Sequence, residues 1–167
     1  MLLLAGPAAA QDRPNPLPLR DVDVTYRIAT GAQPIEQRSR FSSDGQRMRV
    51  DMPTPGVYSI MDYRSHLMSF VVEGDRAALD TPMPPPASPA YLRVGADQVA
   101  GLPCTEWQTQ DTQNRAVITC YTADGVMLRV RRGTEPLAVA TRVAFGPLDP
   151  GLFAVPPGFQ HVTKRPQ

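Results

Sequence analysis

The segment Asp21-Val22-Asp23-Val24-Thr25-Tyr26-Arg27-Ile28 decides the fold of this chain. Its apolar residues stand at every second position, and polar residues fill the positions between them. This period of two is typical of a β-strand that buries one face. The 167-residue sequence shows no long stripe with the 3.6-residue period of a helix. The segment therefore predicts a mainly antiparallel β domain.

Further short strands follow the first one, and turn residues separate them. Ser43-Asp44-Gly45 divides a polar strand that ends at Phe41 from the next strand. Asp124-Gly125 marks another hairpin, because both residues accept the positive φ angles of a type I′ turn. The remaining strands are predicted at residues 48–52, 57–61, 67–72, 76–80, 105–109, 116–121, 126–131 and 137–145.

A proline-rich segment interrupts this series in the middle of the chain. Met83-Pro84-Pro85-Pro86-Ala87-Ser88-Pro89 contains four prolines. Because proline lacks a backbone donor and fixes φ, the segment is neither a helix nor a central strand. We expect residues 82–103 to form an extended crossover or a flap over the sheet. Residues 90–100 have room for one or two helical turns, and Gly95 and Gly101 argue against more.

The N-terminus has the pattern of the end of a secretory signal peptide. Met1-Leu2-Leu3-Leu4 is followed by Ala8 and Ala10, which suit a cleavage site before Gln11. The apolar run has about half of the roughly 20 residues that a membrane-spanning helix needs. We expect residues 1–10 to be a signal remnant, 11–19 a flexible segment, 20–160 a single domain and 161–167 a tail. Residues up to about 16 are expected to make no core contacts. This pattern predicts a periplasmic protein.

Cys104 and Cys120 are the two cysteines of the chain. An oxidising compartment favours a disulfide between them. Two free thiols and a redox-active pair are the alternatives, and the second lacks the usual C-x-x-C spacing. A hairpin with its tip near Thr112 would place the two cysteines directly opposite each other. That pairing would also set Trp107 opposite Val117, on the face away from the disulfide, which we expect to be the packed one.

The composition excludes several classes of function. A formal net charge of +1 provides no field that would attract nucleic acid. The sequence has no G-x-S-x-G elbow, phosphate-binding glycine loop or dinucleotide fingerprint. His66 and His161 are expected in a hairpin tip and the tail, without the partners that a zinc site or a catalytic relay needs. We therefore predict no enzyme, no cofactor, no metal site, no nucleic-acid partner and no transmembrane span.

Methionines are frequent on the predicted strands. Met48, Met52, Met61, Met68 and Met127 all fall on them. Methionine fills irregular cores, but it is also common on surfaces that bind varied apolar ligands. Ordinary core, a pocket for lipid and a site for exported copper are the three interpretations. The copper interpretation is weakened because the methionines show no M-x-M or M-x-x-M spacing.

The C-terminal half carries a recognisable order of motifs. These are Val99-Ala100-Gly101-Leu102-Pro103-Cys104-Thr105-Glu106-Trp107, then Thr119-Cys120-Tyr121-Thr122-Ala123-Asp124-Gly125-Val126, and finally residues 148–159, LDPGLFAVPPGF. The order resembles that of exported proteins with a domain of unknown function, similar in fold to the LolA/LolB lipoprotein carriers and the RseB sensor domain. Met127 departs from it, since relatives often have proline there.

This resemblance covers about residues 20–160 and implies a fold and a site. The fold would be a strongly curved antiparallel sheet, an incomplete barrel with few short helices. In carriers of this fold the concave side holds acyl chains. We therefore predict a non-catalytic periplasmic binding protein for a lipid, an acyl group or another apolar ligand. The expected binding residues on the concave face are Tyr26, Met48, Val50, Met52, Leu128, Val130, Val139, Val143 and Phe153.

A second hypothesis belongs to a different class of function. The domain would be an interaction module with a filled core, which docks another envelope protein through an edge strand or the proline-rich flap. A concavity of at least about 300 Å³ favours the binding protein over this module.

Overall fold

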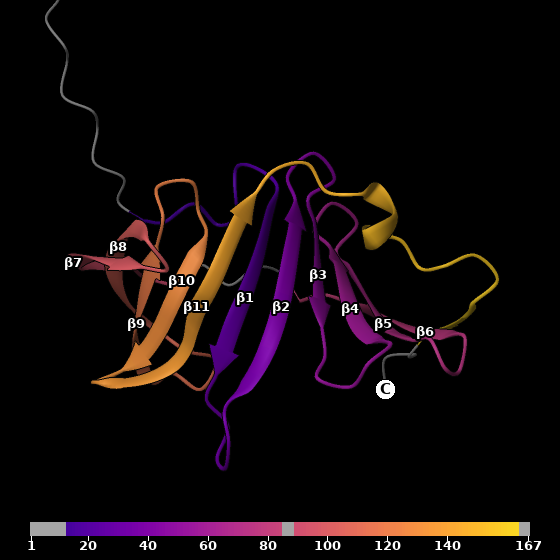
Figure 1. Ribbon diagram of the computed structural model, residues 1–167, viewed down its shortest axis with the longest axis horizontal. Coiled ribbons are helices and arrows are strands. Elements are labelled where there is room, and N and C mark those ends of the chain that lie inside the picture. Colours follow the sequence, from indigo (N-terminus) through magenta and orange to yellow (C-terminus); the bar gives the residue numbers. More distant parts are fainter. Residues whose placement is uncertain (1–12, 85–88, 164–167) are drawn as a thin grey trace, which may run out of the picture.

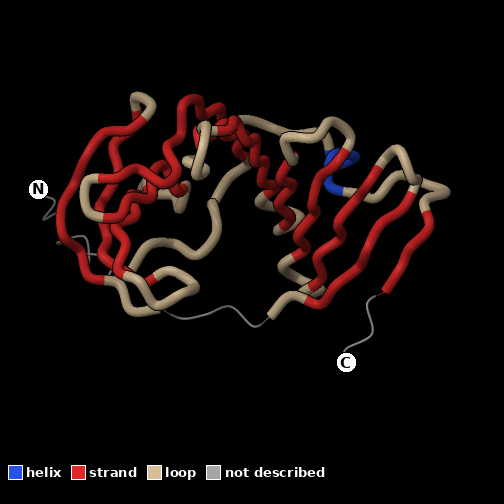
Figure 2. Tube along the Cα trace, turned by 90° about the horizontal axis from the view of Figure 1, so that it is seen from below, coloured by secondary structure: helices blue, strands red, loops and turns tan. Residues whose placement is uncertain are grey.

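A computed structural model describes residues 13–84 and 89–163 of the chain. One sheet of twelve strands makes up the fold, in the spatial order β12-β6-β5-β4-β3-β2-β1-β11-β10-β9-β8-β7 (Figure 1). The sheet is strongly curved and does not close into a barrel (Figure 2), which confirms the predicted fold class. The strands are β1 (Val22–Ile28), β2 (Ile35–Ser42), β3 (Arg47–Asp51), β4 (Val57–Asp62), β5 (Leu67–Val72), β6 (Ala77–Pro82), β7 (Leu92–Val99), β8 (Leu102–Gln110), β9 (Ala116–Tyr121), β10 (Met127–Arg132), β11 (Glu135–Phe145) and β12 (Gln160–Thr163).

Most strands pair with their neighbours in sequence. The exceptions are β1, which pairs with β11 as well as β2, and β12, which pairs with β6. The β12–β6 pair is parallel, and the other pairs are antiparallel. A single 3₁₀ turn, η1 (Pro150–Phe153), is the only helical element of the described residues. That turn is neither long nor apolar enough to cross a membrane, and the described residues contain no other candidate span.

A bulge in β11 changes which residues share a face. Val143 pairs with Val24, but Val139 pairs with Arg27, because Thr141 is skipped in the pairing with β1. Side chains alternate between the two faces of a strand, and an inserted residue reverses that alternation. Val139 and Val143 therefore lie on opposite faces of the sheet.

Two groups of buried side chains form the core. The larger group extends from β1 and β2 to the β7 end of the sheet and includes Val22, Val24, Phe41, Cys120 and Leu128, with Leu128 fully buried. The smaller group lies at the other end, where Val155 and Phe159 pack against a second set of buried residues. These are Tyr58, Ile60, Val71 and Ala78.

The N-terminal segment packs against the domain, contrary to expectation. Pro14 is buried, and the Asn15 side-chain amide donates to the Ala123 carbonyl at 2.9 Å. Leu17 packs against the larger core group. The expectation that residues up to about 16 make no core contacts is therefore wrong for the buried Pro14, whereas the Asn15 hydrogen bond is exposed. The predicted signal remnant, residues 1–10, and its cleavage site lie outside the described residues.

Two other boundaries also differ from those expected. Residues 92–99 form strand β7 and not helical turns, and β8 starts at Leu102, so most of the predicted flap is a β-hairpin. Ala100 and Gly101, with φ of 49° and 77°, make its tight turn. Residues 85–88, the centre of the proline-rich segment, lie outside the described residues. The expected tail overlaps β12, which adds a parallel strand to the sheet.

Candidate functional site

A continuous apolar surface extends across strands β3 to β6 on one face of the sheet. The strand pairing places its side chains opposite one another, and their intermediate exposure distinguishes them from core residues. Two members depart from this intermediate exposure. Leu79 is the most exposed, at 39%, and Ser59 is buried. We call this surface the methionine face. It comprises Met48, Val50, Val57, Ser59, Met61, Met68, Phe70, Val72, Ala77, Leu79 and Thr81.

The methionines form a row at one end of this face. Met48 pairs directly with Met61, and Met61 pairs directly with Met68. Tyr63, from the β4–β5 turn, reaches over the row: its hydroxyl lies 3.8 Å from the Met48 sulfur and 4.0 Å from the Met61 sulfur. Its ring also packs near Phe41, with 6.4 Å between ring centroids. Burial raises the pKa of Tyr63, so its hydroxyl stays neutral at physiological pH.

The opposite face of the same strands is covered by the C-terminal segment. Arg49 alternates with Met48 along β3, and its guanidinium lies 3.5 Å from the centre of the Tyr58 ring and donates to the Leu152 carbonyl at 3.4 Å. The segment that begins with η1 therefore lies on the outer side of the arch (Figure 2). In β4 to β6 the buried apolar residues are all on this outer face, so the methionine face is the inner and less covered one.

Charged groups of this half of the sheet also lie on the outer face. Arg47 pairs with Asp62 at 2.8 Å, and Asp51 pairs with both Arg40 and Arg49. On the neighbouring strands Asp23 and Arg38 form a similar pair. The hydrogen bond from Arg38 lowers the pKa of Asp23. Each of these residues alternates with a residue of the inner face, so the strands separate a charged surface from an apolar one.

His161 is partnered, contrary to expectation. Its Nδ1 atom lies 2.7 Å from Asp80, and the Ser69 hydroxyl donates to the other oxygen of Asp80 at 2.6 Å. Asp80 therefore stands between the serine and the histidine, whereas a nucleophilic relay needs the histidine beside the serine. This group joins β5, β6 and β12, and its hydrogen bonds do not activate Ser69.

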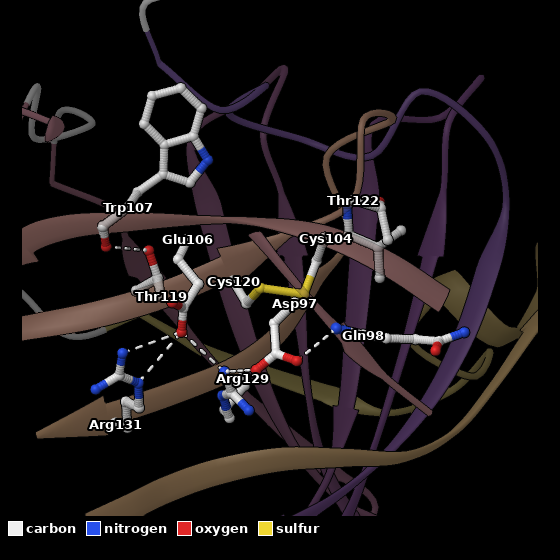
Figure 3. Close-up of a disulfide and its surroundings, with 11 residues drawn as sticks. Asp97, Gln98, Cys104, Glu106, Trp107, Thr119, Cys120, Thr122, Arg129 and Arg131 are labelled. Atoms are coloured by element: carbon white, nitrogen blue, oxygen red, sulfur yellow. Dashed lines mark hydrogen bonds and ion pairs between the residues drawn. A yellow bond between two sulfur atoms is a disulfide. The ribbon is translucent and has the colours of Figure 1, made fainter. Parts of the chain in front are cut away.

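The predicted disulfide between Cys104 and Cys120 is present at the other end of the sheet (Figure 3). The predicted pairing is wrong by two positions, because Cys120 stands opposite Glu106, and Trp107 stands opposite Thr119. The two Cα atoms are 5.5 Å apart. A shift of two residues preserves the faces, so Trp107 still lies on the face away from the disulfide. Both faces are packed here, since the two cysteines are as buried as Trp107.

Four charged residues form a group on the disulfide face. Arg129 of β10 pairs with Asp97 of β7 at 2.6 Å and with Glu106 of β8 at 2.8 Å (Figure 3). Arg131 also pairs with Glu106, at 3.1 Å. The two positive and two negative charges balance within the group. Its members come from three strands, so it ties the end of the sheet together without producing a charged binding surface.

A hollow of about 480 Å³ opens beside the disulfide. Leu102, Cys104 and Phe145 line it, together with the charged Arg20, Asp97 and Asp124. The Arg20 guanidinium stacks 3.5 Å from the centre of the Phe145 ring and pairs with Asp124 at 2.6 Å. The volume of this hollow lies within the usual range for ligand sites, about 300–1,000 Å³. Unlike the methionine face, however, the hollow is flanked by charged groups.

The predicted binding residues fall into three groups in the structure. Met48 and Val50 lie on the methionine face, and Met52 follows β3 beside Val57. Tyr26, Leu128, Val130 and Val143 belong to the inner face or core of the middle strands. Leu128 is fully buried, so it is a core residue. The Tyr26 hydroxyl donates to the Met127 carbonyl at 2.6 Å, so this side chain links β1 to β10.

Two predicted residues lie away from the inner face. Val139 is on the opposite face because of the β11 bulge. Phe153, 3% exposed, belongs to η1 on the outer side, and Phe159 packs against the outer core group. Neither phenylalanine therefore lies on the concave inner face.

Sequence reasoning missed the half of the methionine face that β5 and β6 supply. Phe70 and Leu79 pair directly on this face. The run from Leu67 to Val72 is apolar at odd and even positions alike, so its periodicity does not reveal which residues face inward. Met61 and Met68 were recognised only as strand residues, since their pairing depends on the length of the β4–β5 turn.

The fold and the faces described above define an open, strongly curved sheet with one apolar inner surface. Solved structures share this fold. An uncharacterized conserved protein from Thermus thermophilus matches with a TM-score of 0.64 at 13% identity, over 87% of this chain and 91% of that one. PNGF-II matches with a TM-score of 0.60 at 13% identity, over 87% of this chain and 31% of that one.

MucB, solved in complex with MucA(peri), matches with a TM-score of 0.52 at 18% identity, over 80% of this chain and 54% of the MucB chain. The chain thus spans about half the length of MucB and under a third of PNGF-II. At these identities the likeness shows the fold, and the MucB match agrees with the predicted similarity to the RseB type. No family model matches the sequence, and the search of curated proteins found no match.

Proposed function

We propose that the protein is a non-catalytic binding module of the cell envelope that holds the acyl chain of a lipid on the methionine face. The observation that carries this proposal is the difference in burial between the two faces of β4 to β6. The outer face is covered by the C-terminal segment, whereas the apolar inner face keeps intermediate exposure. An apolar surface that remains exposed in the free protein is a candidate for ligand contact.

The chemistry of the face favours an acyl chain as the ligand. Its residues carry no ionisable group, and Ser59 and Thr81 are its only polar side chains. Strands lie about 4.8 Å apart, so the four strands offer a surface about 14 Å wide. Flexible thioethers adjust to a ligand without a fixed shape. Each square ångström of apolar surface removed from water contributes about 25 cal/mol.

The proposed location in the envelope rests on two supports. A disulfide between Cys104 and Cys120 fits an oxidising compartment. The second support is the fold, which is similar to that of MucB. The sequence motifs resemble those of exported proteins with this type of fold.

Two leucines on edge-proximal strands provide a matched test. Leu79 lies on the methionine face and is 39% exposed, and Leu92 lies on β7 and is 63% exposed. Native mass spectrometry of protein incubated with a phospholipid should show a bound lipid mass for the wild type and for Leu92→Asp. The lipid mass should be lost for Leu79→Asp. Because Leu79 is already exposed, aspartate there should leave the fold intact, which thermal unfolding checks. Absence of lipid on the wild type, or equal binding by both variants, overturns the proposal.

A protein partner is the second candidate function, and the end strand β7 favours it. β7 has a neighbour on one side only, and Leu92 and Val94 on it are 63% and 44% exposed. An exposed edge accepts an extended peptide as a further strand, and MucB was solved with a protein partner. The same two variants separate the candidates, because a partner docked at β7 is lost with Leu92→Asp and kept with Leu79→Asp. Retention of the partner by Leu92→Asp would contradict this docking site.

A further inference from the structure

We propose that Met48, Met61 and Met68 form a binding site for Cu(I). Their three thioether sulfurs belong to three adjacent strands at directly paired positions. The methionines lack M-x-M spacing along the chain. Strand pairing nevertheless brings together methionines that are far apart in sequence.

The geometry allows the three sulfurs to meet at one ion. Directly opposite residues of antiparallel strands have Cβ atoms about 4.5–5.5 Å apart. A methionine side chain has three rotatable bonds, so each sulfur can reach a point above Met61. The Tyr63 hydroxyl lies 3.8 Å from the Met48 sulfur and 4.0 Å from the Met61 sulfur. The sulfurs of Met48 and Met61 therefore both lie near one atom, the Tyr63 hydroxyl oxygen.

The surroundings select a soft ion. Thioethers favour Cu(I), whereas carboxylates and carbonyls suit Mg²⁺ and Ca²⁺. The carboxylates of the same strands, Asp51 and Asp62, lie on the outer face and pair with arginines. The methionine face itself offers no carboxylate, imidazole or thiolate. Zn²⁺, which takes cysteine, histidine and carboxylate ligands, therefore has no ligand set there.

The thioether site has a distinctive pH dependence. Cysteine and histidine sites lose affinity as pH falls because their ligands must lose a proton to bind metal. A thioether carries no proton to lose when it binds a metal. Cu(I) affinity should therefore stay constant between about pH 6 and pH 8.

The site shares the methionine face with the proposed lipid, but the two ligands depend on different properties of it. Leucine in place of methionine keeps the face apolar and removes a metal ligand. Aspartate at Leu79 breaks the apolar surface and leaves the three sulfurs in place. Loss of one function in these variants therefore leaves the other measurable.

Competition with a chromophoric Cu(I) chelator tests the site on the oxidised protein, with ascorbate as the reductant. The wild type should withdraw one equivalent of Cu(I). Met61→Leu should weaken binding by more than the roughly 10- to 100-fold that loss of an outer-shell partner costs. Met127→Leu, on β10 opposite Tyr121, is the matched control and should bind as the wild type does. No competition by the wild type, or equal losses in the two variants, overturns the proposal.

A second measurement does not depend on any variant. Ag(I), a redox-stable substitute for Cu(I), should be added to protein labelled at its methionine methyl groups. The NMR signals of Met48, Met61 and Met68 should shift at one equivalent, and those of Met52 and Met127 should not. Shifts spread over all the methionines, or none at all, would contradict a single site at this row.

Discussion

Glu106 stands directly opposite Cys120, so the disulfide joins Cys120 to Cys104, two positions before Glu106 in β8. The bond therefore runs diagonally across the strand pair. Glu106 also forms salt bridges with Arg129 and Arg131 of β10. Covalent and ionic links thus meet at one position and hold three consecutive strands together.

Loss of the disulfide should reduce stability substantially. The bond closes a loop with a sequence separation of 16 residues, which should contribute about 3 kcal/mol in the chain-entropy model. Cys104→Ala combined with Cys120→Ala should lower the free energy of unfolding by about 2–4 kcal/mol, as measured by urea titration. A change below about 1 kcal/mol, a third of the model's value, would show that the bond adds little to the hairpin.

Added bulk should distinguish the methionine face from the core. Val50 is half-buried on the methionine face, and Val24 is 3% exposed in the larger core group. Phenylalanine at Val24 should overpack the core and cost about 1–3 kcal/mol. Phenylalanine at Val50 should change the thermal unfolding temperature little, because its ring can extend over the open face. Equal destabilisation by both would show that the methionine face is closely packed.

The Asp23–Arg38 pair should make stability depend on pH at the acid end. Because the pKa of Asp23 is lowered in the folded protein, its contribution is present above the unfolded value of about 3.9 and is lost as pH falls through the folded value. Asp23→Asn should cost about 0.2–1 kcal/mol at neutral pH, and this difference should shrink as pH falls below the unfolded value and through the lowered folded one. Urea unfolding of both proteins across this range measures it. A difference that persists in acid would point to a steric effect.

Gly125 should be intolerant of a side chain. Its φ is +86°, and a Cβ atom there would lie 2.7 Å from the Leu17 carbonyl oxygen. Gly125→Ala should destabilise by about 1–3 kcal/mol from backbone strain, and it should also loosen residues 13–19. Limited proteolysis should then cut this segment faster than in the wild type, while Gly133→Ala, where a Cβ meets no atom within 4 Å, should not change the cleavage. Equal cleavage rates would contradict a packed N-terminal segment.

Local patterns in the sequence were sufficient to locate most of the strands. They were not sufficient to predict the register in which the strands pair. Alternation placed β1 and β3 correctly, because polar and apolar residues alternate along both of them. β7 was missed, since Leu92, Arg93 and Val94 are all exposed and a strand without a buried face shows no alternation. The hairpin of β8 and β9 was recognised, but a tip one residue from the expected centre shifted its pairing by two positions.

The errors at the candidate site arise from contacts between distant residues. No local pattern reveals that Thr141 is skipped in the pairing with β1, yet this reverses the face of Val139. The C-terminal segment carries apolar residues that fit either face of the sheet. Its tertiary contacts identify the outer face as the one it covers, since Arg49 donates to the Leu152 carbonyl and Phe159 packs against the outer core group.

The pairing of β1 with β11 has a consequence for how the chain folds. Val22 pairs with Phe145 across most of the sequence, whereas the pairs within β1 to β6 and within β7 to β11 are hairpins between successive strands. Closing a long loop costs more entropy than closing a hairpin, and contacts distant in sequence slow folding. Two meanders should therefore form first and join late along β1 and β11. Until they join, both strands present free edges to other unfolded chains.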